Sequence, residues 1–393
     1  MKITLKKNEE RRILSGHQWI FSNEIEKTED FEINGQIAEL FTSSGKFLGR
    51  GFYNRNSLIA YRHLTDKDEE IGKSFLFRRL SMANALRRKK NNCGEVYRLC
   101  NSESDLLPGL IIDKFYDRYS IQIFSAGMEL LKNEIKEVLM ENFKAEFIIE
   151  KNDNDTRTLE GLEKREGILH DSTDSDEKEF MAELDGIKIM IDLVNGQKSG
   201  YYLDQQENRV LIRKYIKEGD KVLDLFCNEG GFSLNASLAG ATEITAADSS
   251  GHSIKIAVRN SELNGFKNIK FLETDAFDLM NEYFQMPDRF DFIILDPPSF
   301  TKSRKNVFTA LKGYTELNYK AMKLLKPNSF LFTFSCSYHI SEKAFEDMLI
   351  QSAQKADRKI QIVEFRNSSF DHPVLPQMGE TKYLKGYLLR VTV

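Results

Sequence analysis

Residues 221–337 alternate apolar, β-branched and aromatic runs with segments of helical character. The runs are KVLDLFC, EITAADS, IKFLETD, FDFIILDPP and SFLFTFSCS; GFSLNASLAG, HSIKIAVRNSELNGF and FTALKGYTELNYKAMKLL lie between them. Runs of this kind are typical of parallel strands that are buried on both faces of a sheet. Their alternation with helices predicts βαβ units, and hence an α/β, doubly wound, Rossmann-like sheet in the C-terminal part of the chain.

Acidic residues stand at the ends of successive runs. Asp224 ends the first run, Asp248 the second and Asp275 the third. The carboxyl ends of parallel strands share one edge of a sheet, where ligands of this fold bind. An acid after the second strand suits the paired hydroxyls of a ribose, and Asp275 with Ala276 suits an adenine amino group. Any one of these acids could merely cap a helix, but three in succession predict a nucleoside ligand.

A glycine-containing turn follows the first run in VLDLFCNEGGFS (residues 222–233). Gly230 and Gly231 allow backbone N–H groups to approach a ligand closely. The turn lacks the spacing G-x-G-x-x-G, so binding of a dinucleotide pyrophosphate, and with it a nicotinamide dehydrogenase, is disfavoured.

The fourth and fifth runs end in residues suited to chemistry. Two prolines after Asp296 cannot donate to a sheet ladder, so they end the strand and leave Asp296 at the crevice. Cys336 ends the fifth run between two serines. A free cysteine is most often a small buried hydrophobe. At this edge, however, a thiolate can add to carbon 6 of a pyrimidine and make carbon 5 nucleophilic. Cys93, Cys100 and Cys227 are interpreted as structural.

The N-terminal part of the chain has a different character. Residues 1–72 alternate short apolar runs with glycine-containing turns, which predicts a small barrel or sheet. The chain carries a net charge of −4, but residues 1–92 hold 18 Lys and Arg against 12 Asp and Glu. Residues 71–90 predict a basic amphipathic helix whose Arg87 and Arg88 contact phosphates. The alternative is a solvated helix face that links two domains.

Residues 96–170 predict strands and one helix, GMELLKNEIKEVLMENF, and the acidic DSTDSDEKE (residues 171–179) predicts an exposed loop or hairpin tip. No segment approaches the roughly 18 apolar residues of a membrane span, and MKITLKKNEERR lacks the apolar core of a secretory signal. The four cysteines form no C-x-x-C pair. These features favour a cytoplasmic protein without a disulfide framework or metal site.

The run of motifs resembles class I S-adenosylmethionine-dependent methyltransferases. VLDLFCNEGGFS looks like their methionine-cradling first motif and LDPPSF like their fourth. GHQWIFSNEI (residues 16–25) resembles the opening of a PUA RNA-binding domain. Four further segments resemble the PUA-bearing large-subunit rRNA cytosine-5 methyltransferases. They are LCNSESDLLPGLIIDKF (residues 99–115), RTLEGLE (157–163), NGQKSGYYLDQQENR (195–209) and DHPVLPQMGETKYLKGYLL (371–389).

The resemblance implies a PUA-like RNA-binding domain at residues 1–72, a central α+β domain with the basic linker helix at 73–180, and a methyltransferase domain at 181–393. It implies S-adenosylmethionine as cofactor and large-subunit rRNA, free or in an assembling particle, as partner; a homodimer stays open. Cys336 and Asp296 are the expected catalytic residues. The expected cofactor-binding residues are Asp224, Phe226, Asn228, Gly230, Gly231, Asp248, Asp275, Ala276, Tyr202 and Gln205, with Arg209 in support.

Two other functions remain open at this stage. Asp296-Pro-Pro could serve methylation of an adenine or guanine amino group, but that chemistry usually has an aromatic residue directly after the prolines. Here Ser299 stands in that place and Phe300 one position later. The chain could also be a non-catalytic RNA-binding protein of ribosome assembly. His339 and His372 are left without a role.

Overall fold

The computed structural model describes residues 1–90, 93–173, 179–196, 200–287, 289–301 and 303–393. Expectations that involve residues 174–178 of the acidic segment and 197–199 of NGQKSGYYLDQQENR lie outside the described residues. The chain divides into two compact units, each made of several segments. Unit 1 comprises Met1–Phe180, Ile191–Leu203 and Phe370–Thr381, and unit 2 comprises Met181–Met190, Asp204–Ser369 and Lys382–Val393.

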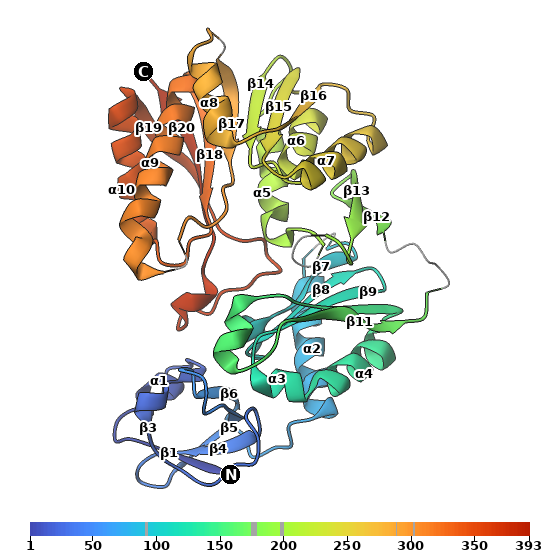
Figure 1. Cartoon of the computed structure of the whole chain (residues 1–393), viewed down its shortest axis with the longest axis vertical. Helices are drawn as coiled ribbons and strands as arrows, with labels where there is room; N and C mark the ends of the chain where they lie inside the picture. Colours follow the sequence, from blue (N-terminus) through green and yellow to red (C-terminus); the bar gives the residue numbers. More distant parts are fainter. Residues whose placement is uncertain (91–92, 174–178, 197–199, 288, 302) are drawn as a thin grey trace. The chain divides into compact units, whose positions relative to one another are not determined.

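Unit 1 begins with a six-stranded sheet in the order β2-β6-β5-β4-β1-β3 (Figure 1). Its interior is apolar, with Ile3, Leu40 and Tyr61 fully buried. The strands predicted from the short apolar runs are present, and β3 is an addition. The elements are β1 (Lys2–Leu5), α1 (Arg11–Leu14), β2 (Trp19–Ile20), β3 (Ile25–Thr28), β4 (Ile37–Phe41), β5 (Phe47–Tyr53) and β6 (Tyr61–Thr65).

A five-stranded sheet in the order β11-β10-β9-β8-β7 forms the second part of unit 1. Helices α2 and α4 pack on it, since Leu80, Val138 and Ile112 share one buried cluster. The helix predicted over GMELLKNEIKEVLMENF is interrupted at Leu131. The elements are α2 (Lys73–Arg88), β7 (Val96–Asn101), β8 (Leu110–Phe115), β9 (Arg118–Ile123), α3 (Ala126–Leu130), α4 (Lys132–Phe143), β10 (Phe147–Asn152) and β11 (Arg165–Asp171).

The two strands that flank the acidic segment, residues 171–179, do not pair with each other. The strand before it, β11, pairs with β10, whereas the strand after it, β12 (Glu179–Leu184), pairs with β13 (Ile187–Asp192) in a separate two-stranded sheet. The segment therefore connects two sheets. Short strands on both sides of a polar stretch suggested a hairpin, in which β11 would pair with β12. Instead β11 pairs with β10.

Unit 2 contains a seven-stranded sheet in the order β16-β15-β14-β17-β18-β20-β19. The first five strands in this order are parallel, and β20 runs antiparallel to β18 and β19. The strands are β14 (Lys221–Leu225), β15 (Glu243–Asp248), β16 (Ile269–Glu273), β17 (Phe290–Leu295), β18 (Leu325–Ser335), β19 (Lys359–Arg366) and β20 (Lys385–Thr392). The helices are α5 (Gln206–Leu211), α6 (Gly231–Leu238), α7 (Gly251–Leu263), α8 (Ala276–Phe284), α9 (Val307–Leu324) and α10 (Glu342–Ala356).

Helices cover both faces of this sheet (Figure 1). Successive residues of β14 point to opposite faces: Leu223 packs with residues of α8, α9 and α10, and Val222 packs with residues of α5 and α6. The uniformly apolar runs are explained by this double burial. The predicted α/β, doubly wound fold is confirmed.

The three domains predicted from the sequence, residues 1–72, 73–180 and 181–393, stay a prediction. The two compact units are a different division of the chain. In particular, residues 191–203 and 370–381 pack with unit 1. None of the described helices is long and apolar enough to cross a membrane.

Candidate active site

Four acidic residues lie at one edge of the unit 2 sheet. Asp248 ends β15, Asp296 directly follows β17, and Asp275 follows β16. Asp224 is the penultimate residue of β14, which runs one residue further than the sequence pattern predicted. Because these four strands are parallel neighbours, their carboxyl ends form a single edge. The sequence prediction that the strands deliver these acids to one place is confirmed.

The turn after β14 has an unusual backbone. Phe226, Asn228 and Gly230 have φ values of 65°, 47° and 81°, and the Cys227 N–H donates to the Ala247 carbonyl at 3.0 Å. A Cβ atom on Gly231 would lie 2.6 Å from Nε of Arg209. The positive φ of Gly230 favours glycine before α6, and a side chain at Gly231 would require Arg209 to move.

Asp224 is fully buried, and only one of its two carboxylate oxygens has a hydrogen-bond partner among the described residues. Its Oδ2 accepts hydrogen bonds from the Ser233 amide at 3.0 Å and the Ser233 hydroxyl at 2.6 Å. Its Oδ1 has no hydrogen-bond partner among the described residues. Burial, reinforced by the nearby Asp296, raises the pKa of Asp224 to about 7. A buried acceptor that lacks a donor fits the amino group of a bound methionine moiety.

Asp248 and Asp275 hold the flanks of the same edge. The Asp248 carboxylate accepts from the Asn228 and Ser250 amides, each at 2.9 Å, which fixes its orientation. Both oxygens retain a second lone pair for ribose hydroxyls. Oδ1 of Asp275 accepts from the Phe277 amide at 2.8 Å and so caps α8, whereas Ala276 is buried. These residues fit S-adenosylmethionine, although Asp275 also has the helix-capping role.

The segment expected to cover the cofactor is divided between the units. Gln205 is buried in unit 2, where its Nε2 donates to Oδ1 of Asp296 at 3.0 Å. Its Oε1 accepts from Asn208 at 2.7 Å. Gln205 therefore orients the Asp296 carboxyl group. Tyr202 is half-buried and belongs to unit 1.

Cys336 directly follows β18, next to β17 in the sheet. Its half-buried thiol lies 3.9 Å from the carbonyl oxygen of Pro297, the residue after Asp296. The Ser337 and Ser299 hydroxyls, 3.0 Å apart, join the same two loops. The nucleophile and the acid predicted from separate motifs are thus placed on adjoining loops.

Sequence reasoning missed Lys385, the first residue of β20. It pairs with Ser335 across the antiparallel ladder, and its Nζ donates to the Ser337 carbonyl at 3.1 Å and the Tyr383 carbonyl at 2.8 Å. Burial lowers the pKa of Lys385. A thiolate at Cys336 would raise the pKa of Lys385, because it would stabilise the charged ammonium group. The signal was present in the sequence: a lysine between Leu384 and the apolar GYLL run is unusual inside a sheet.

The other cysteines, and His372 of the two unassigned histidines, lie in different surroundings. Burial raises the pKa of both Cys227 and Cys100 well above the ordinary value, and both thiols are buried. Cys93 is half-buried, and burial raises its pKa as well. His372 is buried in unit 1, with Nδ1 2.8 Å from Asp371. None of these environments favours a reactive thiolate.

The prediction that Arg87 contacts phosphates is wrong. Its side chain is fully buried and makes a bidentate ion pair with Asp105, at 2.5 and 2.7 Å. It also donates to the backbone carbonyls of Arg98 and Asp371. Arg88 is partly exposed and pairs with Glu95 at 2.7 Å. The basic end of α2 mixes a structural arginine with surface charges, which composition cannot distinguish.

Family models match two parts of the chain. Residues 3–66 match the family model described as a PUA-like domain, and residues 216–379 match one described as a methyltransferase domain. The ribosomal RNA large subunit methyltransferase I of Aeromonas hydrophila is 39% identical over 99% of this chain and 98% of its own length. The chain belongs to the ribosomal RNA large subunit methyltransferase I family. The relative of the same name from Vibrio cholerae is 36% identical, with 99% of each chain covered.

Solved structures share the fold of this methyltransferase family member. A structure described as a SAM-dependent methyltransferase from Streptococcus mutans has a TM-score of 0.83, with 20% identity, 99% of this chain and 100% of that chain covered. A methyltransferase complexed with SAH has a TM-score of 0.85 over the same shares, at 20% identity. The predicted S-adenosylmethionine cofactor, PUA-like domain and methyltransferase domain are confirmed by the family assignment.

Proposed function

We propose that this methyltransferase forms 5-methylcytosine in large-subunit rRNA through a covalent adduct on Cys336. The observation that supports the proposal is the distance of 3.9 Å between the Cys336 thiol and the carbonyl oxygen of Pro297, the residue after Asp296. The names of the relatives support large-subunit rRNA as the substrate. The PUA-like domain supports RNA binding.

The chemistry explains why a cysteine is needed. Carbon 5 of cytosine is a poor nucleophile until a thiolate adds to carbon 6. In the proposed reaction the Cys336 sulfur forms a bond to carbon 6, and the electron pair moves to carbon 5. Bound S-adenosylmethionine supplies an electrophilic methyl group. After carbon 5 has accepted that methyl group, a base removes the carbon-5 proton, the carbon–sulfur bond breaks and the thiolate is restored.

Asp296 is proposed to hold the Watson–Crick edge of the target base. One carboxyl oxygen accepts from the N4 amino group, and the acid form donates to N3, where negative charge develops during addition. A hydrogen bond that strengthens as charge builds lowers the barrier. Gln205 donates to Asp296 at 3.0 Å and keeps the carboxyl group in one orientation.

Lys385 is proposed to favour the thiolate of Cys336. A free thiol with a pKa of about 8.5 is only a few per cent ionised at neutral pH, and a nearby cation increases that fraction. The buried ammonium group of Lys385 is fixed by two carbonyl groups, one of which belongs to Ser337, the neighbour of Cys336. Lys385 acts on the nucleophile and is therefore a positioning residue.

Methylation of an amino group is less well supported. That reaction needs no covalent adduct, and it uses an aromatic ring beside the acid to stack the base. Phe300 packs instead on Tyr314, with ring centroids 4.5 Å apart, and Tyr314 is fully buried. The aromatic residue near Asp-Pro-Pro is thus engaged in the core.

The decisive experiment traps the adduct. In RNA that carries 5-fluorocytidine at the target, carbon 5 has no removable proton after methyl transfer, so elimination is blocked. We expect a denaturation-resistant protein–RNA complex with the wild type and with Cys227→Ala, the matched control, and no complex with Cys336→Ala. A complex that persists in Cys336→Ala, or wild-type methylation by that variant, would exclude Cys336 as the nucleophile.

A further inference from the structure

A chain of hydroxyl groups joins the two loops that carry the proposed nucleophile and the proposed acid. Its centre is the Tyr314 hydroxyl, on α9, which lies 3.1 Å from the hydroxyl oxygens of both Ser335 and Ser337. These two serines directly precede and follow Cys336. The Ser337 hydroxyl in turn lies 3.0 Å from the Ser299 hydroxyl, in the Asp-Pro-Pro loop. One side chain of α9 therefore contacts both neighbours of the proposed nucleophile.

The direction of each hydrogen bond in this chain follows from its two ends. A hydroxyl group has one proton to donate. Ser335 donates to Tyr314, and Ser299 donates to the Thr301 carbonyl at 2.8 Å. Tyr314 therefore donates to Ser337, and Ser337 donates to Ser299. Because the last acceptor is a carbonyl oxygen, the chain cannot carry a proton away from the site, but it can hold the two loops together.

The place of the Tyr314 hydroxyl is set by the packing of its ring. The residue is fully buried, and its ring centroid lies 4.5 Å from that of Phe300 and 5.5 Å from that of Phe345. Burial raises the pKa of Tyr314 to about 12, so the hydroxyl keeps its proton at neutral pH. The hydroxyl group is therefore a fixed donor and acceptor to which the two loops can be tied.

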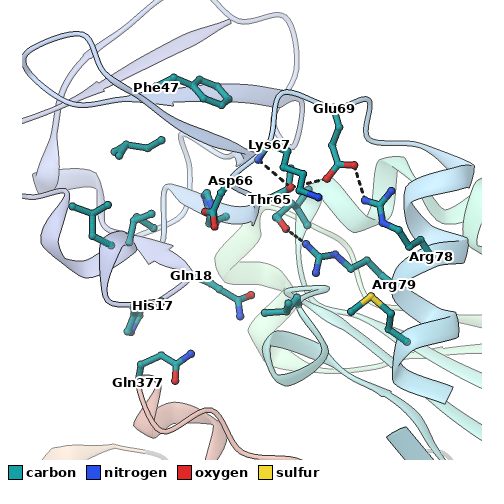
Figure 2. A pocket seen from close by; sticks show the side chains of 18 of the residues that line it. His17, Gln18, Phe47, Thr65, Asp66, Lys67, Glu69, Arg78, Arg79 and Gln377 are labelled. Atoms are coloured by element: carbon teal, nitrogen blue, oxygen red, sulfur yellow. Dashed lines mark hydrogen bonds and ion pairs between the residues drawn. The ribbon is translucent and has the colours of Figure 1, made fainter. Parts of the chain in front are cut away.

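A polar cluster in unit 1 shows the contrast with an accessible set of hydrogen bonds. There Glu69 accepts from the Thr65 hydroxyl at 2.7 Å and from Arg78 at 2.6 Å, beside a cavity of about 720 Å³ (Figure 2). The Arg78 and Glu69 side chains are 49% and 22% exposed, so water can replace either partner. Tyr314 and the two serines beside Cys336 are instead fully buried. A hydrogen bond lost among them is not replaced by one to water.

We propose that Tyr314 is a positioning residue of the methyltransferase reaction. Through the serines on either side of Cys336, it holds the thiol in place relative to Asp296, so that sulfur meets carbon 6 while the acid holds the edge of the same base. A displacement of about 1 Å between reacting groups can cost about a hundredfold in rate. Lys385 acts on the charge of the thiol, whereas Tyr314 acts on its position. The inference rests on the proposed function, because it takes Cys336 as the nucleophile.

Tyr314→Phe tests the proposal, because it removes the oxygen at the centre of the chain and keeps the ring. With saturating 5-fluorocytidine RNA and S-adenosylmethionine, adduct formation should slow by about tenfold or more, while the KM for S-adenosylmethionine stays unchanged. Tyr387→Phe is the matched control. Tyr387 is also fully buried and packs on Phe345 at 5.6 Å, but its hydroxyl donates to Glu346 at 3.1 Å, outside the chain. Equal adduct rates for the two variants would overturn the proposal.

Two further measurements separate positioning from other roles. Ser337→Ala breaks the same chain, so the double variant with Tyr314→Phe should be no slower than the slower single variant, and multiplied effects would contradict a shared chain. Alkylation of Cys336 by iodoacetamide should keep the wild-type pH profile in Tyr314→Phe. A shifted profile would assign Tyr314 to thiolate stabilisation and overturn the positioning role. A wild type without an adduct at Cys336 defeats the proposed function, whereas an adduct formed equally fast by Tyr314→Phe defeats only this inference.

Discussion

At the scale of single residues, the site depends on polar groups that are buried before any ligand arrives. Asp224 and Lys385 are both buried in unit 2, and burial disfavours the charged form of each. For each residue, neighbouring hydrogen bonds and charges offset only part of the free-energy cost of burying the charge. The ionisation of Asp224 should therefore be coupled to cofactor binding, and the charge of Lys385 to the ionisation of Cys336. Both couplings can be measured.

The affinity for S-adenosylmethionine should depend on the ionisation of Asp224. With its pKa near 7, only the ionised fraction can receive the ligand's amino group as a cation. The affinity should thus rise about tenfold from about pH 6 to about pH 7.5, and binding should release a proton from Asp224. Calorimetry in buffers of different ionisation enthalpy measures both effects. Asp224→Asn should bind more weakly with little pH dependence over that range, and a flat wild-type profile would rule out this contact.

The reactivity of Cys336 should depend on the charge of Lys385. Lys385→Gln can still donate to a carbonyl but lacks the positive charge, so the pKa of the Cys336 thiol should rise and its alkylation by iodoacetamide at neutral pH should slow several-fold. The rate is followed against pH by mass analysis of the Cys336 peptide. Lys385→Arg should restore the lower thiol pKa. Identical pH profiles for wild type and Lys385→Gln would leave Lys385 with a purely structural role.

At the scale of elements, α2 shows how a basic helix can combine two roles. Its Arg87 is an interior anchor, whereas Arg88 carries a surface ion pair. Removing one partner of a buried ion pair leaves an uncompensated charge, in this case Asp105.

Arg87→Met should therefore lower the free energy of unfolding by about 3–5 kcal/mol. Arg88→Gln, the adjacent control, should change it by less than about 1 kcal/mol, because exposed ion pairs contribute little. Urea unfolding followed by circular dichroism measures both variants. Equal effects of the two substitutions would show that Arg87 is not the anchor that its contacts indicate.

The elements also show what could be predicted from the sequence. The five parallel strands and the positions of Asp224, Asp248, Asp275 and Asp296 followed from apolar runs and their endings, because strand order brings such endings together. The burial of Arg87 depends on a partner far away in the chain, Asp371. Periodicity carries no information about such partners. A lysine inside an apolar run marked Lys385 as unusual, but its neighbours come from β18, so the sequence did not indicate its place beside Cys336.

At the scale of the whole molecule, charge and function are divided along the chain. The basic excess of residues 1–92 lies in unit 1 together with the PUA-like domain, and the acids that fit the cofactor lie in unit 2. The residues suited to binding a polyanion and the residues suited to binding the cofactor thus belong to different units.

The path of the backbone between the two units has a practical consequence. Unit 1 also includes segments 191–203 and 370–381, which follow the first strand residues of unit 2 in the sequence. Asp371 in the second of these segments accepts hydrogen bonds from Arg87 and Arg98. A single cut after residue 180 would not liberate a finished RNA-binding module. Unit 1 would then be assembled from two polypeptides. The two fragments are therefore suited to split-protein complementation, and neither is suited to exchange as an independent domain.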